Sequence, residues 1–343
     1  MTALRPLALT TAFVFATACA DTSSQESATA ADSSSSGDEA SSQTKGDDSP
    51  STTAQPSTTT DVTTDGPADS SGSSDPTVDP STSDSGEDSG GPMPLGPSPG
   101  CGSQPGSILS GSINAAGIDR EYIIQLPDDY DPDYAYPLIF GFHGLGENMD
   151  GARWRFQAGE QWNGQAIGIY PQGRYFGSLG ATNWEYGEGD PDVQLWDALA
   201  TAASDQLCID RDRIFVQGFS SGGFFTHALM CYRGDYIRAA APSGAGMVVT
   251  NCGDAVPMWS AHATNDEIVP FHYGEELRDF WLDKAGCGGM TTPIAPTEHC
   301  AEYQGCGDDP IVWCTFDQGH WYMEDWKTPA TTAFFQRFES LTE

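Results

Sequence analysis

The sequence has few basic residues and no long hydrophobic run. Lysine and arginine together number 14 in 343 residues, against 49 aspartates and glutamates, a formal net charge of −35. So acidic a surface repels nucleic acids and anionic lipids, and we expect neither as a partner. The apolar run from Leu7 to Ala16 is too short to cross a bilayer. The negative charge does not exclude neutral substrates such as sugars or polyesters.

The N-terminal run has the form of a secretory signal peptide. Arg5 precedes it, and the segment Ala-Thr-Ala-Cys follows at 16–19. Ala-x-Ala suits an ordinary signal peptidase, whereas the cysteine after it resembles a bacterial lipobox, although Ala16 stands where leucine is usual. We favour 1–18 as the signal peptide and Cys19 as a lipid attachment site, because a tether-like segment follows. The prediction is a secreted or cell-surface lipoprotein of a bacterium, touching the membrane only through that lipid.

Residues 19–100 have almost no apolar side chains. They are rich in Ser, Thr, Asp, Gly and Pro, and 15 acidic residues between 21 and 100 face Lys45 alone. Such a segment cannot bury enough apolar area to offset its ordering entropy, so we predict a disordered acidic linker. The folded domain is then 101–343, with 34 acidic and 12 basic residues and a net charge near −22.

Nine cysteines are present, but no Cys-x-x-Cys pair. With Cys19 set aside, eight remain, and behind a signal peptide they predict four disulfides. A zinc site is the competing interpretation, but the spacing lacks paired ligands, so we expect no metal. Proximity suggests Cys231–Cys252 and Cys300–Cys306 as pairs. The eight are Cys101, Cys208, Cys231, Cys252, Cys287, Cys300, Cys306 and Cys314.

Short apolar runs alternate with helical patterns through the folded domain. Strands are predicted at 121–127, 137–143, 166–172, 213–219, 238–244, 256–263 and 311–316, and helices at 192–207, 221–231, 273–284 and 328–341. Asp192 is the expected cap of the first helix. Several strands are apolar on both faces, as buried parallel strands are. The fold class is therefore α/β, a mostly parallel central sheet with helices on both faces.

The stretch VQGFSSGGF at 216–224 places a serine in a turn between a predicted strand and a predicted helix. Gly218-Phe219-Ser220-Ser221-Gly222 fits the Gly-x-Ser-x-Gly nucleophile elbow in the context that this motif requires. We predict Ser220 as the nucleophile. Ser221 is a rival, but it lies off the centre of the pattern.

A serine nucleophile needs a base, and the base needs a carboxylate to orient it. His320 follows the last strand in a loop, where the base belongs, whereas the other five histidines are excluded by order or place. Asp266 follows the strand 256–263 and is predicted to orient His320; Glu267 and Asp317 are the competitors. His143-Gly144-Leu145-Gly146 follows another strand, and we expect the amide of Ser221 and that of Gly144 or Leu145 to form the oxyanion hole.

These motifs together resemble one family. The strings YPLIFGFHGLGEN, GIYPQG, CIDRDRIFVQGFSSGG, AAAPSGAG, DEIVPF and GHW make 118–338 similar to the feruloyl esterases of carbohydrate esterase family 1 and to polyhydroxybutyrate depolymerases. The resemblance implies an α/β-hydrolase catalytic domain at 101–343, no cofactor, and Ser220, Asp266 and His320 as its triad. The cysteines of tannase-like feruloyl esterases beside Ser and His are missing here, which argues against that subgroup.

The predicted activity is hydrolysis of hydroxycinnamoyl esters on plant cell-wall polysaccharide such as xylan. Trp184, Phe219 and Trp321, with Tyr322, lie near the predicted site and suit an aromatic acyl group. Three alternatives stay open: a polyhydroxybutyrate depolymerase acting on polyester, an acetylxylan esterase, and a non-catalytic surface binding module.

Overall fold

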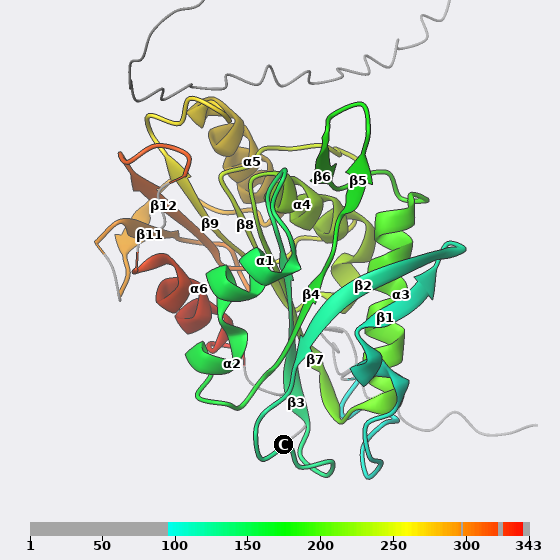
Figure 1. The fold of residues 1–343 in the computed structure, drawn as a ribbon. Coiled ribbons are helices and arrows are strands. Elements are labelled where there is room, and N and C mark those ends of the chain that lie inside the picture. The colour runs from blue at the N-terminus through cyan, green and yellow to red at the C-terminus, as the bar shows by residue number, and fades with distance from the viewer. Residues whose placement is uncertain (1–94, 296–297, 322–324, 339–343) are drawn as a thin grey trace, which may run out of the picture. The chain divides into compact units, whose positions relative to one another are not determined.

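The computed structural model describes residues 95–295, 298–321 and 325–338. Within them a ten-stranded sheet runs in the order β1-β2-β4-β3-β7-β8-β9-β12-β11-β10, and its six central strands, β4 to β12, pair in parallel. The outer strands at both edges are antiparallel. Because parallel neighbours end at one edge, the loops after them gather there (Figure 1).

The strands have these bounds: β1 Ser112–Ala115, β2 Ile118–Gln125, β3 Tyr136–Phe142, β4 Ile167–Pro171, β7 Ile209–Phe219, β8 Ala239–Ser243, β9 Met258–Ala263, β10 Thr291–Pro293, β11 Cys300–Tyr303 and β12 Ile311–Phe316. A separate hairpin pairs β5 Arg174–Phe176 with β6 Ala181–Asn183. Two short 3₁₀ helices span Ser107–Ser110 and Gly234–Tyr236. The predicted strands are all present, with bounds shifted by a few residues.

Helices cover both faces of the sheet (Figure 1). Their bounds are α1 Met149–Phe156, α2 Ala158–Gln161, α3 Pro191–Gln206, α4 Ser221–Arg233, α5 Phe271–Lys284 and α6 Lys327–Phe335. Leu138, Phe140 and Phe142 of β3 pack with α3, α4 and α5 in one core, whereas Ile139 packs with α1, α2 and α6 in the other. Alternate residues of a strand point to opposite faces, so one apolar strand serves both cores. No helix of the described residues is long and apolar enough to span a membrane.

The helix bounds also differ from the prediction by a few residues, and two of the differences have a clear physical reason. Asp190, not Asp192, is the N-cap of α3, because Asp192 lies in the first turn and forms a buried ion pair with Arg120 (2.6 Å). The last helix ends at Phe335 rather than 341; Phe338 is still buried beyond it. Leu341, predicted on that helix, lies outside the described residues.

The eight cysteines form four disulfides, as predicted. The structure confirms Cys231–Cys252, but Cys300–Cys306 is wrong, because Cys300 lies directly opposite Cys314 in the β11–β12 pairing. Cys306 instead bonds to Cys287, and Cys101 bonds to Cys208.

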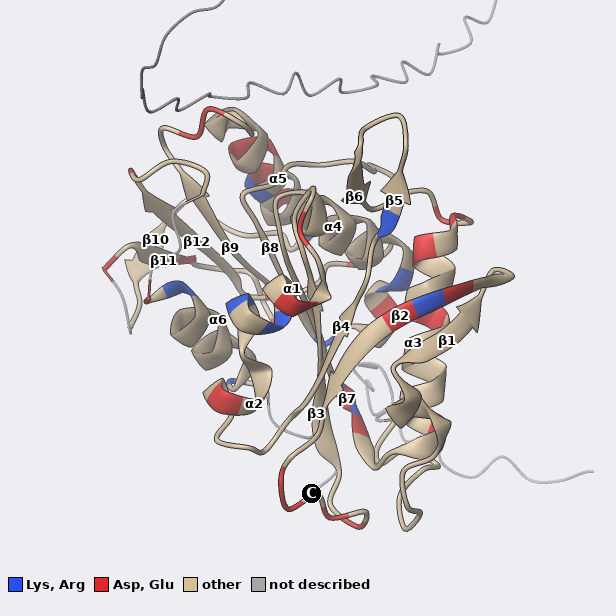
Figure 2. Cartoon of the chain, in the orientation of Figure 1, with Lys and Arg blue, Asp and Glu red and all other residues tan. Residues whose placement is uncertain are grey.

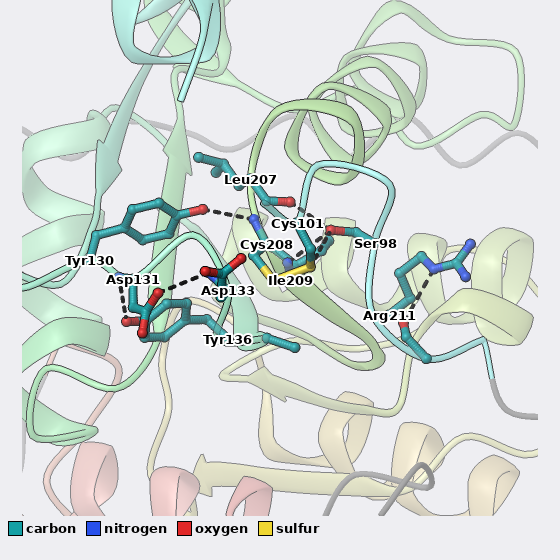
Figure 3. Close-up of a disulfide and its surroundings, with 12 residues drawn as sticks. Ser98, Cys101, Tyr130, Asp131, Asp133, Tyr136, Leu207, Cys208, Ile209 and Arg211 are labelled. Atoms are coloured by element: carbon teal, nitrogen blue, oxygen red, sulfur yellow. Dashed lines mark hydrogen bonds between the residues drawn. A yellow bond between two sulfur atoms is a disulfide. The ribbon is translucent and has the colours of Figure 1, made fainter. Parts of the chain in front are cut away.

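The Cys101–Cys208 disulfide holds the start of the described chain against the amino end of β7 (Figure 3). The Ser98 hydroxyl donates to the Leu207 carbonyl (2.6 Å) and accepts from the Ile209 amide (2.9 Å). Leu95 and Gly96 donate their amides to Asp212 (2.8 and 2.9 Å). This end of the strand is therefore fixed by covalent and polar contacts together.

Candidate active site

Ser220 lies at the turn between β7 and α4. Its backbone has φ 55° and ψ −122°, a region that non-glycine residues adopt only under strain. Its amide donates to the Ser243 carbonyl (2.9 Å), and its carbonyl accepts from Phe224 in the first turn of α4 (2.9 Å). The surrounding strand and helix thus hold the serine in the conformation of a nucleophile elbow.

The flanking glycines are required by close backbone approach. A Cβ on Gly218 would lie 2.1 Å from the Gly222 carbonyl oxygen, and a Cβ on Gly222 would lie 2.1 Å from the Phe142 carbonyl oxygen. Neither contact can be relieved by moving a side chain, because both partners are backbone atoms. The glycines therefore let α4 begin directly against the ends of β3 and β7.

Asp266 and His320 are in contact. The Nδ1 of His320 lies 2.6 Å from Oδ2 of Asp266, and both side chains are 1% exposed. The other carboxylate oxygen accepts the amides of Ile268 (2.9 Å) and Val269 (2.8 Å), which fixes the acid at the end of β9. The contact holds the imidazole with its Nδ1 toward the acid, so Nε2 is the ring nitrogen that can accept a proton.

The electrostatics keep Asp266 ionised. Burial by itself would raise the pKa of this carboxyl group, but hydrogen bonds from His262, His320 and the backbone outweigh it, so the pKa lies well below its ordinary value. His262 was not foreseen at the site; its Nε2 lies 3.5 Å from Asp266 Oδ2. The Nε2 of His320 is buried and has no hydrogen-bond partner in the described chain.

Ser220 and His320 share one support at the end of β8. The Phe219 ring lies 4.9 Å from the His320 ring, centroid to centroid. Ser243 accepts the Ser220 amide, and a Cβ on the next residue, Gly244, would lie 3.6 Å from His320 Cε1. The structure thus places the predicted serine, histidine and aspartate at one edge of the sheet, on the loops after β7, β12 and β9.

The oxyanion prediction narrows to two amides. The Gly144 amide is not available, because it donates to Glu147 Oε2 (2.8 Å). The amides of Leu145 and Ser221 donate to no group in the described part of the chain. That of Ser221 opens α4, so the positive end of the helix dipole adds to it.

His143 orients the loop that carries the Leu145 amide, a role that sequence reasoning missed. It is fully buried, and burial is the main reason that its pKa is lowered. Its Nε2 accepts the Gly173 amide (2.9 Å), so the neutral ring donates from Nδ1 to the Gly144 carbonyl (2.8 Å). Its position in the His-Gly-Leu-Gly string was the available signal.

The aromatic residues predicted to bind substrate differ in how exposed they are. Trp184 is wrong as a substrate contact, because it is 2% exposed, stacks on Phe225 (4.9 Å) and donates its Nε1 to the His143 carbonyl. Trp321 is 59% exposed, and its ring lies 5.1 Å from that of His320. Phe219 is buried, and its ring lies 4.9 Å from that of His320 and 6.4 Å from that of Trp321. Tyr322 lies outside the described residues.

Of two cavities in the described part of the chain, only the smaller is lined by triad residues. One of about 50 Å³ lies under His320 between the rings of Phe219, Trp259 and Phe316, and it is too small for a hydroxycinnamoyl group. A larger one of about 780 Å³ lies at the amino ends of the strands, lined by residues such as Asp128 and Tyr134, away from the triad residues. Ser220 lines neither of these two cavities.

One cluster of metal-ligand types lies among the described residues. The ligand atoms of His227, Cys231 and Cys252 lie within 4.8 Å of one another. Both sulfurs are joined in a disulfide, however, so neither is the thiolate that binds a metal.

Fold and site together define a class. The structure is similar to an acetyl xylan esterase from Aspergillus awamori, with a TM-score of 0.51, 15% identity, and coverage of 63% of this chain and 94% of that one. This likeness shows the α/β-hydrolase fold. A comparison with profiles of known protein families found no match.

Curated relatives identify the family within that class. The chain is 30% identical over 236 residues to feruloyl esterase C of Emericella nidulans, covering 65% of this chain and 83% of the relative. It is 31% identical over 253 residues to feruloyl esterase D of Neurospora crassa, covering 65% and 82%. The chain therefore belongs to the feruloyl esterases and is a carboxylic ester hydrolase.

Proposed function

We propose that the protein hydrolyses hydroxycinnamoyl esters of plant cell-wall polysaccharide through Ser220, His320 and Asp266. The observation that carries the proposal is the 2.6 Å contact between Asp266 and His320, which leaves His320 Nε2 buried without a hydrogen-bond partner among the described residues. The ring of Phe219, the residue before the strained Ser220, lies 4.9 Å from the His320 ring, so both side chains belong to the same edge of the sheet. The names of the curated relatives, which are feruloyl esterases, support a hydroxycinnamoyl acyl group.

The proposed mechanism assigns one role to each of these groups. His320 Nε2 takes the proton of the Ser220 hydroxyl as the oxygen attacks the ester carbonyl, and Asp266 stabilises the resulting imidazolium. The amides of Leu145 and Ser221 stabilise the negative carbonyl oxygen. His320 then gives the proton to the leaving sugar alcohol, and a water molecule releases the acid by the same route.

Surface aromatics support an aromatic acyl group. Trp321 is exposed beside His320, and its ring lies 6.4 Å from that of Phe219 in an edge-to-face arrangement. A cinnamoyl ring packs well against such side chains. Polyhydroxybutyrate, which has no ring, gains less from them.

The test compares substrates and variants. Methyl ferulate should be hydrolysed faster than methyl acetate or a hydroxybutyrate trimer, and Ser220→Ala should lower kcat/KM by at least about 10⁴-fold at unchanged fold. Ser178→Ala, an exposed serine on the β5–β6 hairpin, is the matched control. Cleavage of the trimer alone would refute the substrate, and full activity of Ser220→Ala would refute the site.

Secretion is part of the same proposal. Four disulfides among the described residues support an oxidising compartment. The predicted signal peptide 1–18, the lipid site Cys19 and the linker 19–100 lie outside those residues, apart from the last six of the linker. Mass spectrometry of the mature N-terminus should find a diacylglyceryl group on Cys19; an unmodified terminus would refute the lipoprotein.

A further inference from the structure

The carboxylate of Glu147 closes the oxyanion loop, residues 143–148, on itself. Its Oε2 accepts the Gly144 amide (2.8 Å), and the Glu147 amide donates to the Gly144 carbonyl (3.2 Å). On the other side, the Thr182 hydroxyl donates to the Glu147 carbonyl, and the Gly146 amide donates to the Thr182 carbonyl (2.9 Å). The loop is thus held from within by a side chain and from outside by β6.

Arg155 connects this loop to the histidine side of the site. Its Nη2 forms an ion pair with Glu147 Oε1, and its side chain is only 10% exposed. The guanidinium carbon lies 4.3 Å from the centroid of the Phe219 ring, which in turn packs on His320. Figure 2 shows basic residues on α1 and at the start of α6, on a molecule otherwise rich in acidic ones.

The charge of Glu147 lies close to the nucleophile. The position of a Cβ on Gly144 is 3.3 Å from Glu147 Oε2 and 3.5 Å from Ser220 Cβ. A bare carboxylate so near would oppose the negative charge that develops on the substrate oxygen. The Arg155 guanidinium neutralises that carboxylate, so the loop can be fixed by an acid without this electrostatic cost.

We propose that Glu147 and Arg155 are positioning residues for ester hydrolysis. By binding the Gly144 amide, Glu147 leaves that of Leu145 free to face the substrate oxygen, and Arg155 cancels the charge of Glu147. Neither side chain is required to touch the reacting atoms. The inference rests on the proposed function, because it assumes an oxyanion beside Ser220.

The test is a double-mutant cycle on p-nitrophenyl acetate. Arg155→Gln leaves an uncompensated carboxylate and should lower kcat about 100-fold with KM within about twofold, comparable to losing one oxyanion donor. Glu147→Gln keeps an acceptor for Gly144 and should cost about fivefold. The double variant should be faster than Arg155→Gln alone. Additive losses, or an Arg155→Gln variant with wild-type kcat, would overturn the proposal.

Rescue and control variants separate this role from a general structural one. Arg155→Lys keeps the charge and should stay within about tenfold of the wild-type kcat; a folded Lys variant that loses 100-fold overturns the charge-neutralising role even if Arg155→Gln does not fold. Asp197→Asn breaks the Arg233 ion pair (2.7 Å) between α4 and α3 and should leave kcat unchanged. If Ser220→Ala is active, the proposed function fails; if only the cycle is additive, this inference fails alone.

Discussion

The two ends of β7 are built for different purposes. At the amino end, Ser98 forms hydrogen bonds with the backbone, and the Cys101–Cys208 disulfide joins the strand to the preceding chain (Figure 3). Asp212 adds hydrogen bonds to the Leu95 and Gly96 amides. At the carboxyl end, Ser220 has a strained backbone, and the neighbouring Ser221 amide has no partner in the described chain.

The difference shows how a single strand divides stability and chemistry. Strain and unpaired donors cost free energy, and a site keeps them only where the surrounding structure is rigid enough to enforce them. The well-bonded amino end and the two cores supply that rigidity. Changes at the carboxyl end should therefore act mainly on the rate, and changes at the amino end should act on stability alone.

The largest effect should come from Asp266→Asn. Loss of the carboxylate removes the group that orients His320 and stabilises its charged form, so kcat should fall about 10⁴-fold. Steady-state kinetics on methyl ferulate measures the loss, with thermal unfolding to verify the fold. A loss under tenfold would show that Asp266 is not the orienting acid.

At the opposite end, Cys101→Ser with Cys208→Ser should lower the free energy of unfolding by about 4 kcal/mol, because the bond closes a loop of more than one hundred residues. The value of kcat at 25 °C should not change. Urea denaturation measures the first and kinetics the second. A fall in kcat of the folded variant would contradict the view that the amino end affects stability alone.

Acid should narrow the stability gap between the wild type and Asp266→Asn. A carboxyl group with a lowered folded-state pKa contributes stability that is fully present above its unfolded pKa, about 3.9, and is lost as the pH falls through the folded pKa. The gap should be about 2 kcal/mol at pH 7 and shrink below pH 4. Denaturation at both pH values tests this, and a gap that widens in acid would contradict it.

The smallest effect should come from Asp212→Asn. An amide side chain keeps one acceptor oxygen, so one of the two bonds to the Leu95 and Gly96 amides is lost. The free energy of unfolding should fall by about 1 kcal/mol at unchanged kcat. Wild-type stability would show that this contact adds nothing to the disulfide beside it.

Much of the fold was predictable because the central strands are apolar on both faces. Strands such as β1 (Ser112–Ala115) and β10 (Thr291–Pro293) were missed, since they are short and largely exposed and show no periodicity. The prediction of the Cys300 partner was wrong because the partner is set by the register of β11 and β12 rather than by distance along the chain.

The three proposed triad residues could be selected from the sequence because each follows a predicted strand and the order Ser, Asp, His is the one that this fold requires. Trp184 was misassigned, because sequence alone cannot distinguish an aromatic that lines a site from one packed behind it. Arg155 was missed entirely. Its contact with Glu147 depends on how α1 leaves the oxyanion loop, and no local pattern records that geometry.

The docking of Leu95 at the amino end of β7 also decides how the enzyme can be attached to something else. Asp212, which binds the Leu95 amide, precedes Ser220 by eight residues of chain, so the first described residue lies roughly 26 Å along the strand from the proposed nucleophile. We therefore expect a fusion partner or solid support joined directly at Leu95 to leave the proposed catalytic edge accessible to bulky insoluble polymers.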